Sequence, residues 1–207
     1  MGRFSILLSG HLTPTARLRA QLQNTPCIAA DGGMRHAASL GIRPELWVGD
    51  FDSTPLELLH DFAEVPRLEF PAAKDQTDGE LAINAALERG ATELLLVGAL
   101  GGQTDHTLAH LTLAVRLARS GTKVILTSGL EEAHPVIPGR LRPGLPPRTK
   151  FSLLPLSNLD GLTLRGAEWP LERVSVELGN SLTLSNVVRE GLEVELVSGY
   201  GVLIAQV

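Results

Sequence analysis

Two observations predict an α/β protein built from two domains. From residue 3 to about residue 127, short apolar runs alternate with helical patterns, which is typical of βα units and a mostly parallel sheet. From about residue 130 onward, short segments of period two are separated by Pro or Gly, which is typical of antiparallel strands. We therefore expect a mostly parallel α/β domain over residues 1–128, followed by an antiparallel β-sandwich-like domain over residues 129–207.

The first domain is expected to alternate strands with capped helices. The apolar runs that predict strands are 4–8, 27–30, 46–48, 94–97 and 124–127. Helix starts are expected at three threonines that precede Pro or Glu, because these patterns satisfy the first helical N–H groups: Thr13, Thr54 and Thr77. Helix ends are expected at Gly41, Gly90 and Gly121, since glycine readily adopts the left-handed conformation.

The second domain is expected to consist of short strands. The segments of period two are 134–139, 151–156, 161–166, 173–178, 192–197 and 202–207. A Pro-rich piece over residues 135–147 could be a linker or an edge-strand hairpin.

Composition and charge exclude several classes of protein. With 43% apolar and 20% charged residues, the 207-residue chain has the composition of a folded protein. No apolar run approaches the roughly 18 to 20 residues that a membrane span needs, so we expect no membrane partner. The net charge of −5 argues against a nucleic-acid partner. Cys27 is the only cysteine, which excludes an internal disulfide and predicts a reducing, cytoplasmic location.

Acidic residues are concentrated in one stretch of the chain. Residues 31–80 hold eleven acidic and four basic side chains. The stretch contains six of the eight aspartates: Asp31, Asp50, Asp52, Asp61, Asp75 and Asp78. Because the short Asp carboxylate suits Mg²⁺ coordination and helix N-termini, this stretch is the first functional candidate.

Four short motifs are expected just after strands of the first domain, at the ends where open parallel sheets bind ligands, and two of them are acidic motifs early in the chain. In ADGG at residues 30–33, Asp31 ends a strand and two glycines let the backbone approach a ligand, although the same letters fit an ordinary turn. The second motif is GDFDS at residues 49–53. In an extended segment Asp50 and Asp52 would point the same way and could hold one divalent cation, whereas the alternative is a solvated turn.

Two further motifs stand beside later helix starts. In KDQTD at residues 74–78, Asp78 falls in the first turn of a helix capped by Thr77, which the helix dipole alone would explain. Lys74 and Asp75 lie outside that cap, and a cation beside acids is what a triphosphate with its metal would meet. GALGGQTDH at residues 98–106 is a glycine-rich turn whose N–H groups can cradle phosphate, but no GK[ST] follows as in a Walker A motif.

A row of small polar side chains marks the second domain. Residues 177–188 are expected to form a strand, a turn and a strand, and alternation puts Ser181, Thr183 and Ser185 on one face. Beside Trp169 such a row could hold a polar heterocycle by stacking and hydrogen bonding. The alternative is a solvated sheet face.

Taken in this order, ADGG, GDFDS, KDxTD, GGxxDH and a late SxxxSN resemble the motifs of the thiamine pyrophosphokinase family. The resemblance covers nearly the whole chain, including the linking segment TDGELAINAALERGATELLLVGALGG and the terminal VLIAQV. It implies a nucleotide-binding α/β domain followed by a β-rich thiamine-binding domain, in a homodimer with the active site between subunits. It also implies that ATP and thiamine react to give AMP and thiamine diphosphate, with Mg²⁺ required.

The resemblance further implies roles for single residues. The Mg²⁺ ligands would be Asp50, Asp52 and Asp78, and the catalytic acids would be these three and Asp31. The ATP-binding set would be Asp31, Lys74, Asp75, Gln76, Thr77, Gly101, Gly102 and Asp105. The thiamine-binding set would be Ser181, Ser185, Asn186 and Trp169.

Two positions depart from the family pattern. Gln103 stands where the family usually has Arg, so charge compensation must come from Mg²⁺, Lys74 or another Arg. Val187 stands where an acid is common, which puts a polar contact of that side chain in doubt.

Three alternative functions follow from parts of the pattern. A diphosphokinase acting on a hydroxymethylpterin would keep the acidic motifs and change the acceptor domain. A non-catalytic thiamine or nucleotide sensor would not need all three aspartates of the expected metal site. A glycosyltransferase that uses a DxD metal site would leave KDQTD and GGQTDH unexplained.

Overall fold

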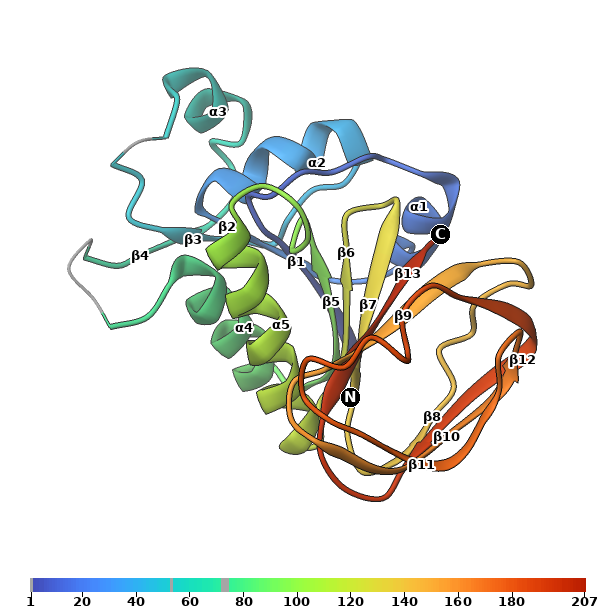
Figure 1. The fold of residues 1–207 in the computed structure, drawn as a ribbon. Coiled ribbons are helices and arrows are strands. Elements are labelled where there is room, and N and C mark those ends of the chain that lie inside the picture. Colours follow the sequence, from blue (N-terminus) through green and yellow to red (C-terminus); the bar gives the residue numbers. More distant parts are fainter. Residues whose placement is uncertain (1, 53, 72–74) are drawn as a thin grey trace. The chain divides into compact units, whose positions relative to one another are not determined.

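The computed structural model of the chain describes residues 2–52, 54–71 and 75–207 (Figure 1). It is a mixed α/β protein that divides into two compact units. The first unit comprises Met1–Thr107 and Leu126–Gly129, and the second comprises Leu108–Ile125 and Leu130–Val207. Within the described ranges, none of the helices is long and apolar enough to cross a membrane.

The first unit alternates strands and helices, as predicted. Its elements are β1 (Gly2–Leu7), α1 (Ala16–Leu22), β2 (Cys27–Ala30), the 3-10 helix η1 (Asp31–Met34), α2 (Arg35–Leu40), β3 (Leu46–Gly49), α3 (Leu56–Asp61), β4 (Arg67–Glu69), α4 (Asp78–Glu88) and β5 (Ala91–Val97). Helix α5 (Thr104–Arg119) and strand β6 (Lys123–Thr127) contribute residues to both units. The sequence analysis missed β4, because its three residues are all exposed and carry no apolar run.

The strands β5, β1, β2, β3 and β4 are parallel neighbours in that order. From β1 the chain moves strand by strand to β4, and α4 then carries it back to β5 on the other side of β1. Because such crossovers are right-handed, α4 covers the opposite face of these strands from α1 and α2 (Figure 1). The carboxyl ends of all five strands meet at one edge, and the direction of winding reverses between β1 and β5.

One of the three predicted helix starts is confirmed and two are wrong. Thr77 and Glu80 form a capping box at the start of α4. Helix α1 is capped by Thr15 instead of Thr13: the Thr15 hydroxyl accepts from the Leu18 amide at 3.2 Å, whereas the Thr13 amide donates to the Ser128 carbonyl at 2.8 Å, outside the helix. Helix α3 begins after Pro55, whose ψ of 137° is extended, and it has no side-chain cap. The glycines expected at helix ends, 41, 90 and 121, all have positive φ.

The second unit is built from strands that pair only antiparallel in the pairings described, as predicted. They are β7 (Glu131–Val136), β8 (Gly139–Leu141), β9 (Lys150–Pro155), β10 (Leu159–Ala167), β11 (Leu171–Val176), β12 (Asn186–Leu196) and β13 (Gly201–Gln206). Strand β13 lies between β7 and β9. Strand β12 begins beside β9 and continues between β10 and β8. The Pro-rich piece contains the short strand β8, which pairs with the distant β12, so this piece is an edge strand and forms neither a hairpin nor a plain linker.

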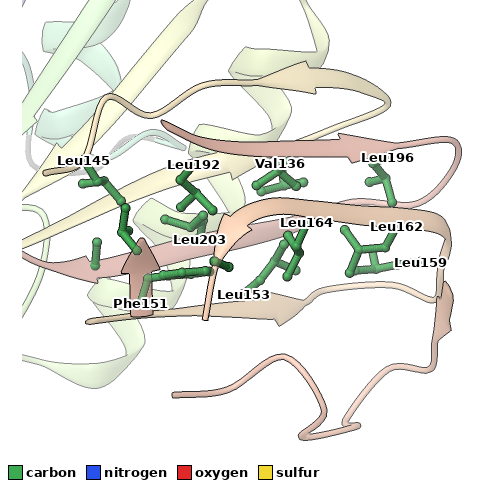
Figure 2. Close-up of a cluster of buried hydrophobic side chains, with 14 of the residues drawn as sticks. Val136, Leu145, Phe151, Leu153, Leu159, Leu162, Leu164, Leu192, Leu196 and Leu203 are labelled. Atoms are coloured by element: carbon green, nitrogen blue, oxygen red, sulfur yellow. The ribbon is translucent and has the colours of Figure 1, made fainter. Parts of the chain in front are cut away.

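The core of the second unit consists mainly of aliphatic side chains from alternate strand positions. Leu162 and Leu164 of β10 are fully buried, as are Leu153 of β9 and Leu203 of β13. Figure 2 shows these side chains gathered between layers of strands. Each such leucine contributes about 1.5 to 3 kcal/mol through burial. The residues of the polar 177–185 segment lie outside this cluster.

Candidate functional site

Most of the predicted site residues lie in loops that follow parallel strands of the first unit. They are Asp31 after β2, Asp50 and Asp52 after β3, Asp75, Gln76, Thr77 and Asp78 after β4, and Gly101, Gly102 and Asp105 after β5. Because the carboxyl ends of parallel neighbours meet at one edge, the fold brings these four loops to the same edge of the sheet. Lys74 lies outside the described residues.

Asp31 is held in an unusual backbone conformation at the start of η1. Its φ is +40°, in the left-handed region that non-glycine residues seldom adopt. Its carbonyl accepts a hydrogen bond from the indole Nε1–H of Trp47 at 2.9 Å. Its Oδ1 atom is buried and has no hydrogen-bond partner within the described part of the chain. An orphaned buried carboxylate oxygen is costly, so this atom is placed to accept a bond from a ligand or to bind a cation.

The second acidic loop turns where an extended segment was predicted. Phe51 has a φ of +60°, and the amide of Asp52 donates to Oδ1 of Asp50 at 3.3 Å. The extended conformation from which the two carboxylates were expected to point the same way is therefore not formed. Strand β3 ends at Gly49, and the left-handed residue Phe51 lies between the two aspartates.

No three His, Cys, Asp or Glu side chains among residues 2–52, 54–71 and 75–207 are gathered closely enough to form a metal-ligand group. Asp50, Asp52 and Asp78 are thus not a closed ligand set. This donor chemistry fits Mg²⁺, which is usually bound through one or two carboxylates and keeps its other positions for waters and substrate phosphates. The unpaired oxygen of Asp31 adds a further anionic donor at the same edge.

Thr77 is the N-cap of helix α4. Its hydroxyl accepts from the amide of Glu80 at 3.2 Å, and its own amide donates to the Glu80 carboxylate at 3.3 Å. This reciprocal pair fixes Asp78 as the first helical residue. At the start of α5, Asp105 Oδ1 accepts from the amide of His106 at 2.9 Å. Both carboxylates therefore stand at helix N-termini, where the helix dipole favours negative charge.

The loop after β1 is a site element that the sequence analysis missed. The Gly10 amide donates to the Gly98 carbonyl at 3.0 Å, which joins this loop to the glycine-rich loop after β5. A Cβ on Gly10 would lie only 2.3 Å from that carbonyl oxygen, so the two loops can meet only because residue 10 is glycine. Here, between β1 and β5, the winding of the sheet reverses, and doubly wound sheets bind ligands at such points. The Ser-Gly pair after the first strand was the available signal.

Two residues of helix α2 hold the loop after β1. Arg35 donates to the carbonyl of Ser9. His36 Nε2 lies 2.9 Å from the carbonyl of Gly10, and because a carbonyl only accepts, Nε2 carries the proton. Burial lowers the pKa of His36 below its ordinary value, and the bond to Gly10 only partly opposes this. The imidazole is therefore neutral near pH 7.

The depressed pKa of His36 predicts a pH-dependent stability. Below the ordinary value of 6.5 the unfolded chain binds this proton more readily than the folded chain, so folding loses stability as the pH falls through that range. His36→Gln keeps an N–H donor without a titrating ring. We expect wild type to lose more free energy of unfolding than His36→Gln between pH 8 and about pH 5.5, measured by urea denaturation. Parallel losses in the two proteins would contradict this assignment.

The predicted polar face of the second unit does not form. Ser181 and Ser185 are exposed, whereas Thr183 is buried and donates to the carbonyl of Leu153 at 2.6 Å. The alternation fails because residues 177–185 are turns: Leu184 N–H donates to the Ser181 carbonyl, and Ser185 has a φ of +57°. The two serines nevertheless remain on the surface of the same segment.

Asn186 and Trp169 are joined directly. The Asn186 amide oxygen accepts from the Trp169 backbone N–H at 3.2 Å, and its amide nitrogen donates to the Trp169 carbonyl at 2.8 Å. Asn186 itself is buried, but the Trp169 side chain is 59% exposed. The buried amide therefore fixes the backbone that presents an exposed indole.

Comparison with known proteins finds a matching family model in each half of the chain. A family model described as "Thiamin pyrophosphokinase, catalytic domain" matches residues 19–126, and one described as "Thiamin pyrophosphokinase, vitamin B1 binding domain" matches residues 142–203. A relative from Bacillus subtilis, named thiamine pyrophosphokinase, is 31% identical over 168 residues, which cover 79% of this chain and 78% of that protein.

Solved structures agree in fold over nearly the entire length. The crystal structure of thiamine pyrophosphokinase from Bacillus subtilis has a TM-score of 0.86 at 26% identity and covers 99% of this chain and 98% of that one. The structure of a thiamin pyrophosphokinase family protein from Enterococcus faecalis has a TM-score of 0.83 at 27% identity, with 99% of each chain covered.

Proposed function

Because the chain belongs to the thiamine pyrophosphokinase family, we propose that it transfers the pyrophosphoryl group of ATP to the hydroxyethyl oxygen of thiamine, giving thiamine diphosphate and AMP. One observation carries the proposal furthest. Acid-bearing and glycine-rich loops meet at the carboxyl edge of the parallel strands, in a chain whose second unit matches the vitamin B1 binding family model.

The proposed acidic site consists of Asp31, Asp50, Asp52 and Asp78. Placed alone at one edge, these carboxylates would repel a triphosphate, so the arrangement requires a divalent cation. Asp50, Asp52 and Asp78 would hold Mg²⁺, which when bound neutralises charge on the phosphates. Asp31 lies at the same edge with an unpaired oxygen and would orient the reacting group beside it.

The ATP side of the proposed site includes the loops after β1, β4 and β5. Backbone N–H groups of Gly101 and Gly102 would contact phosphate oxygens, and Asp75, Gln76, Thr77 and Asp105 would border the nucleotide. Gln103 supplies no charge at a position where the family resemblance implies an Arg. Because the Arg35 guanidinium is exposed beside the loop after β1, we assign the compensating charge to Arg35 together with Lys74.

The thiamine side of the proposed site contains Ser181, Ser185, Asn186 and Trp169. The exposed indole of Trp169 would stack on a thiamine ring, and Asn186 would act by fixing the backbone of Trp169. We expect Trp169→Ala to raise KM for thiamine about 3- to 10-fold, with KM for ATP unchanged, in steady-state assays. Trp169→Phe should retain most of the affinity. An equal rise in both KM values would contradict the stacking role.

The proposed division of labour assigns ATP and Mg²⁺ to residues 1–128 and thiamine to residues 129–207. Its support is that one family model ends at residue 126 and the other begins at residue 142. We also propose a cytoplasmic homodimer with the active site at the subunit interface. Its support is the apolar surface of the segment that carries the thiamine-binding residues, where Leu178 is 62% and Leu182 57% exposed. Sedimentation at micromolar concentration tests the dimer, and a monomer would contradict it.

The acceptor decides between the proposed function and its nearest rivals. Purified protein, ATP and Mg²⁺ are incubated separately with thiamine and with a hydroxymethylpterin, and the products are identified by mass. Thiamine diphosphate in the first reaction alone supports the proposal. Pyrophosphorylated pterin alone would reassign the acceptor, and thiamine binding without turnover would place the protein among sensors.

A further inference from the structure

We propose that Trp47 is a positioning residue that fixes the backbone of both acidic loops, those of Asp31 and of Asp50 to Asp52, in the conformation the metal site needs. This inference rests on the proposed function for its catalytic consequence but not for its structural content. Trp47 lies in the middle of β3, is fully buried, and carries none of the sequence motifs that predicted the site.

Each acidic loop contains one non-glycine residue in the left-handed region. These residues are Asp31, with φ of +40°, and Phe51, with φ of +60°. Such conformations cost energy and persist only where surrounding contacts enforce them. Something in the structure must therefore hold both loops.

Trp47 contacts both of these residues. Its indole Nε1–H donates to the Asp31 carbonyl at 2.9 Å. Its ring system and the Phe51 ring form a T-shaped pair, with 5.0 Å between centroids and 82° between planes. One rigid, buried side chain thus joins the polar anchor of the first loop to the aromatic anchor of the second.

Two neighbours reinforce this arrangement. The Arg67 guanidinium on β4 lies 5.5 Å from the Trp47 ring centroid and 5.7 Å from the Phe51 ring centroid, and its NH2 group donates to the Leu59 carbonyl at 3.0 Å. A Cβ on Gly49, two residues after Trp47, would lie 3.3 Å from the Asp31 Cα, so the end of β3 and the Asp31 loop approach closely. Groups that orient metal ligands in this way typically change metal affinity or activity about 10- to 100-fold when they are removed.

Two variants separate the two contacts. Trp47→Phe removes the N–H donor and keeps an aromatic ring, whereas Phe51→Leu removes the ring between the aspartates. We expect both to raise the Mg²⁺ concentration for half-maximal activity about 10- to 100-fold, with KM for thiamine within about twofold of wild type. In ligand-free protein, hydrogen exchange should accelerate in residues 31–34 and 50–52 of Trp47→Phe, and only in 50–52 of Phe51→Leu.

Phe62→Leu is the matched control. Phe62 is buried in the same unit under another guanidinium, with Arg43 6.0 Å from the ring centroid, but it contacts neither acidic loop in the described interactions. It should lose stability without changing the Mg²⁺ requirement or exchange in either loop. Trp47→Phe and Phe51→Leu behaving like Phe62→Leu in both measurements would overturn the inference. Because the exchange experiment needs no substrate, it tests Trp47 even if the proposed reaction is wrong.

Discussion

Asp52→Asn is expected to lower kcat by about 100- to 1,000-fold while leaving the Kd for thiamine near the wild-type value. Asp52 follows β3 in the proposed Mg²⁺ site, and the amide that replaces its carboxylate cannot supply the same negative charge to a cation. The loss falls on turnover because charge on the transferring group is greatest in the transition state. Steady-state kinetics and calorimetric thiamine titration measure the two quantities separately.

Asp61→Asn is the control for that experiment. Asp61 ends α3, is exposed, and interacts with His60 at 3.5 Å, so it carries the same chemistry outside the site. It should retain wild-type kcat. Near-wild-type turnover in Asp52→Asn would remove Asp52 from the metal site, and an equal loss in both variants would show that any lost acid in this stretch has the same effect.

Gly10→Ala is expected to lower kcat/KM for ATP by about 100-fold. The added Cβ would meet the Gly98 carbonyl oxygen at 2.3 Å and the Gly101 carbonyl oxygen at 3.0 Å, and both belong to backbone that cannot rotate away. The loops after β1 and β5 must then separate by about 1 Å, a displacement that typically costs this much in rate. Overpacking should also lower the free energy of unfolding by about 1 to 3 kcal/mol.

Gly2→Ala is the matched substitution at the other end of β1. A Cβ at residue 2 meets nothing within 4 Å, so activity and stability should stay close to wild type. Thermal unfolding followed beside the kinetics separates the two effects of Gly10→Ala. Unchanged kcat/KM for ATP with reduced stability alone would show that the close approach of the loops supports the fold but not the nucleotide site.

Much of the fold could be predicted because its signals are local. Strands β2, β3 and β5 are mainly buried apolar runs. The start of α4 is predicted by its capping box, Thr77 and Glu80, which lie three positions apart. Strand β4 has only exposed residues and is fixed by pairing with β3, which no local pattern records. The predicted strand before β12 was wrong because the residues there alternate in polarity but form a turn, in which the Leu184 amide donates to the Ser181 carbonyl.

The candidate site, too, has features that local sequence predicts and features that depend on residues distant in the chain. Motif order and spacing identified the acid-bearing loops, although the strand before the loop of Asp75 and Asp78, β4, was not recognisable. The positive φ of Phe51, the buried oxygen of Asp31 and the contact of Gly10 with the β5 loop all depend on neighbours distant in sequence. Trp47 was predicted as part of a strand, and its bond to Asp31 depends on the parallel pairing of β2 with β3.

The most direct test of the central claim is to quantify AMP, ADP and thiamine diphosphate in one reaction of the purified protein with ATP, Mg²⁺ and thiamine. Attack of the thiamine hydroxyl on the β-phosphorus breaks the bond to AMP, so the account predicts AMP and thiamine diphosphate in equal amounts, with no ADP and no thiamine monophosphate. ADP formed together with thiamine monophosphate, or AMP formed without thiamine diphosphate, would contradict it.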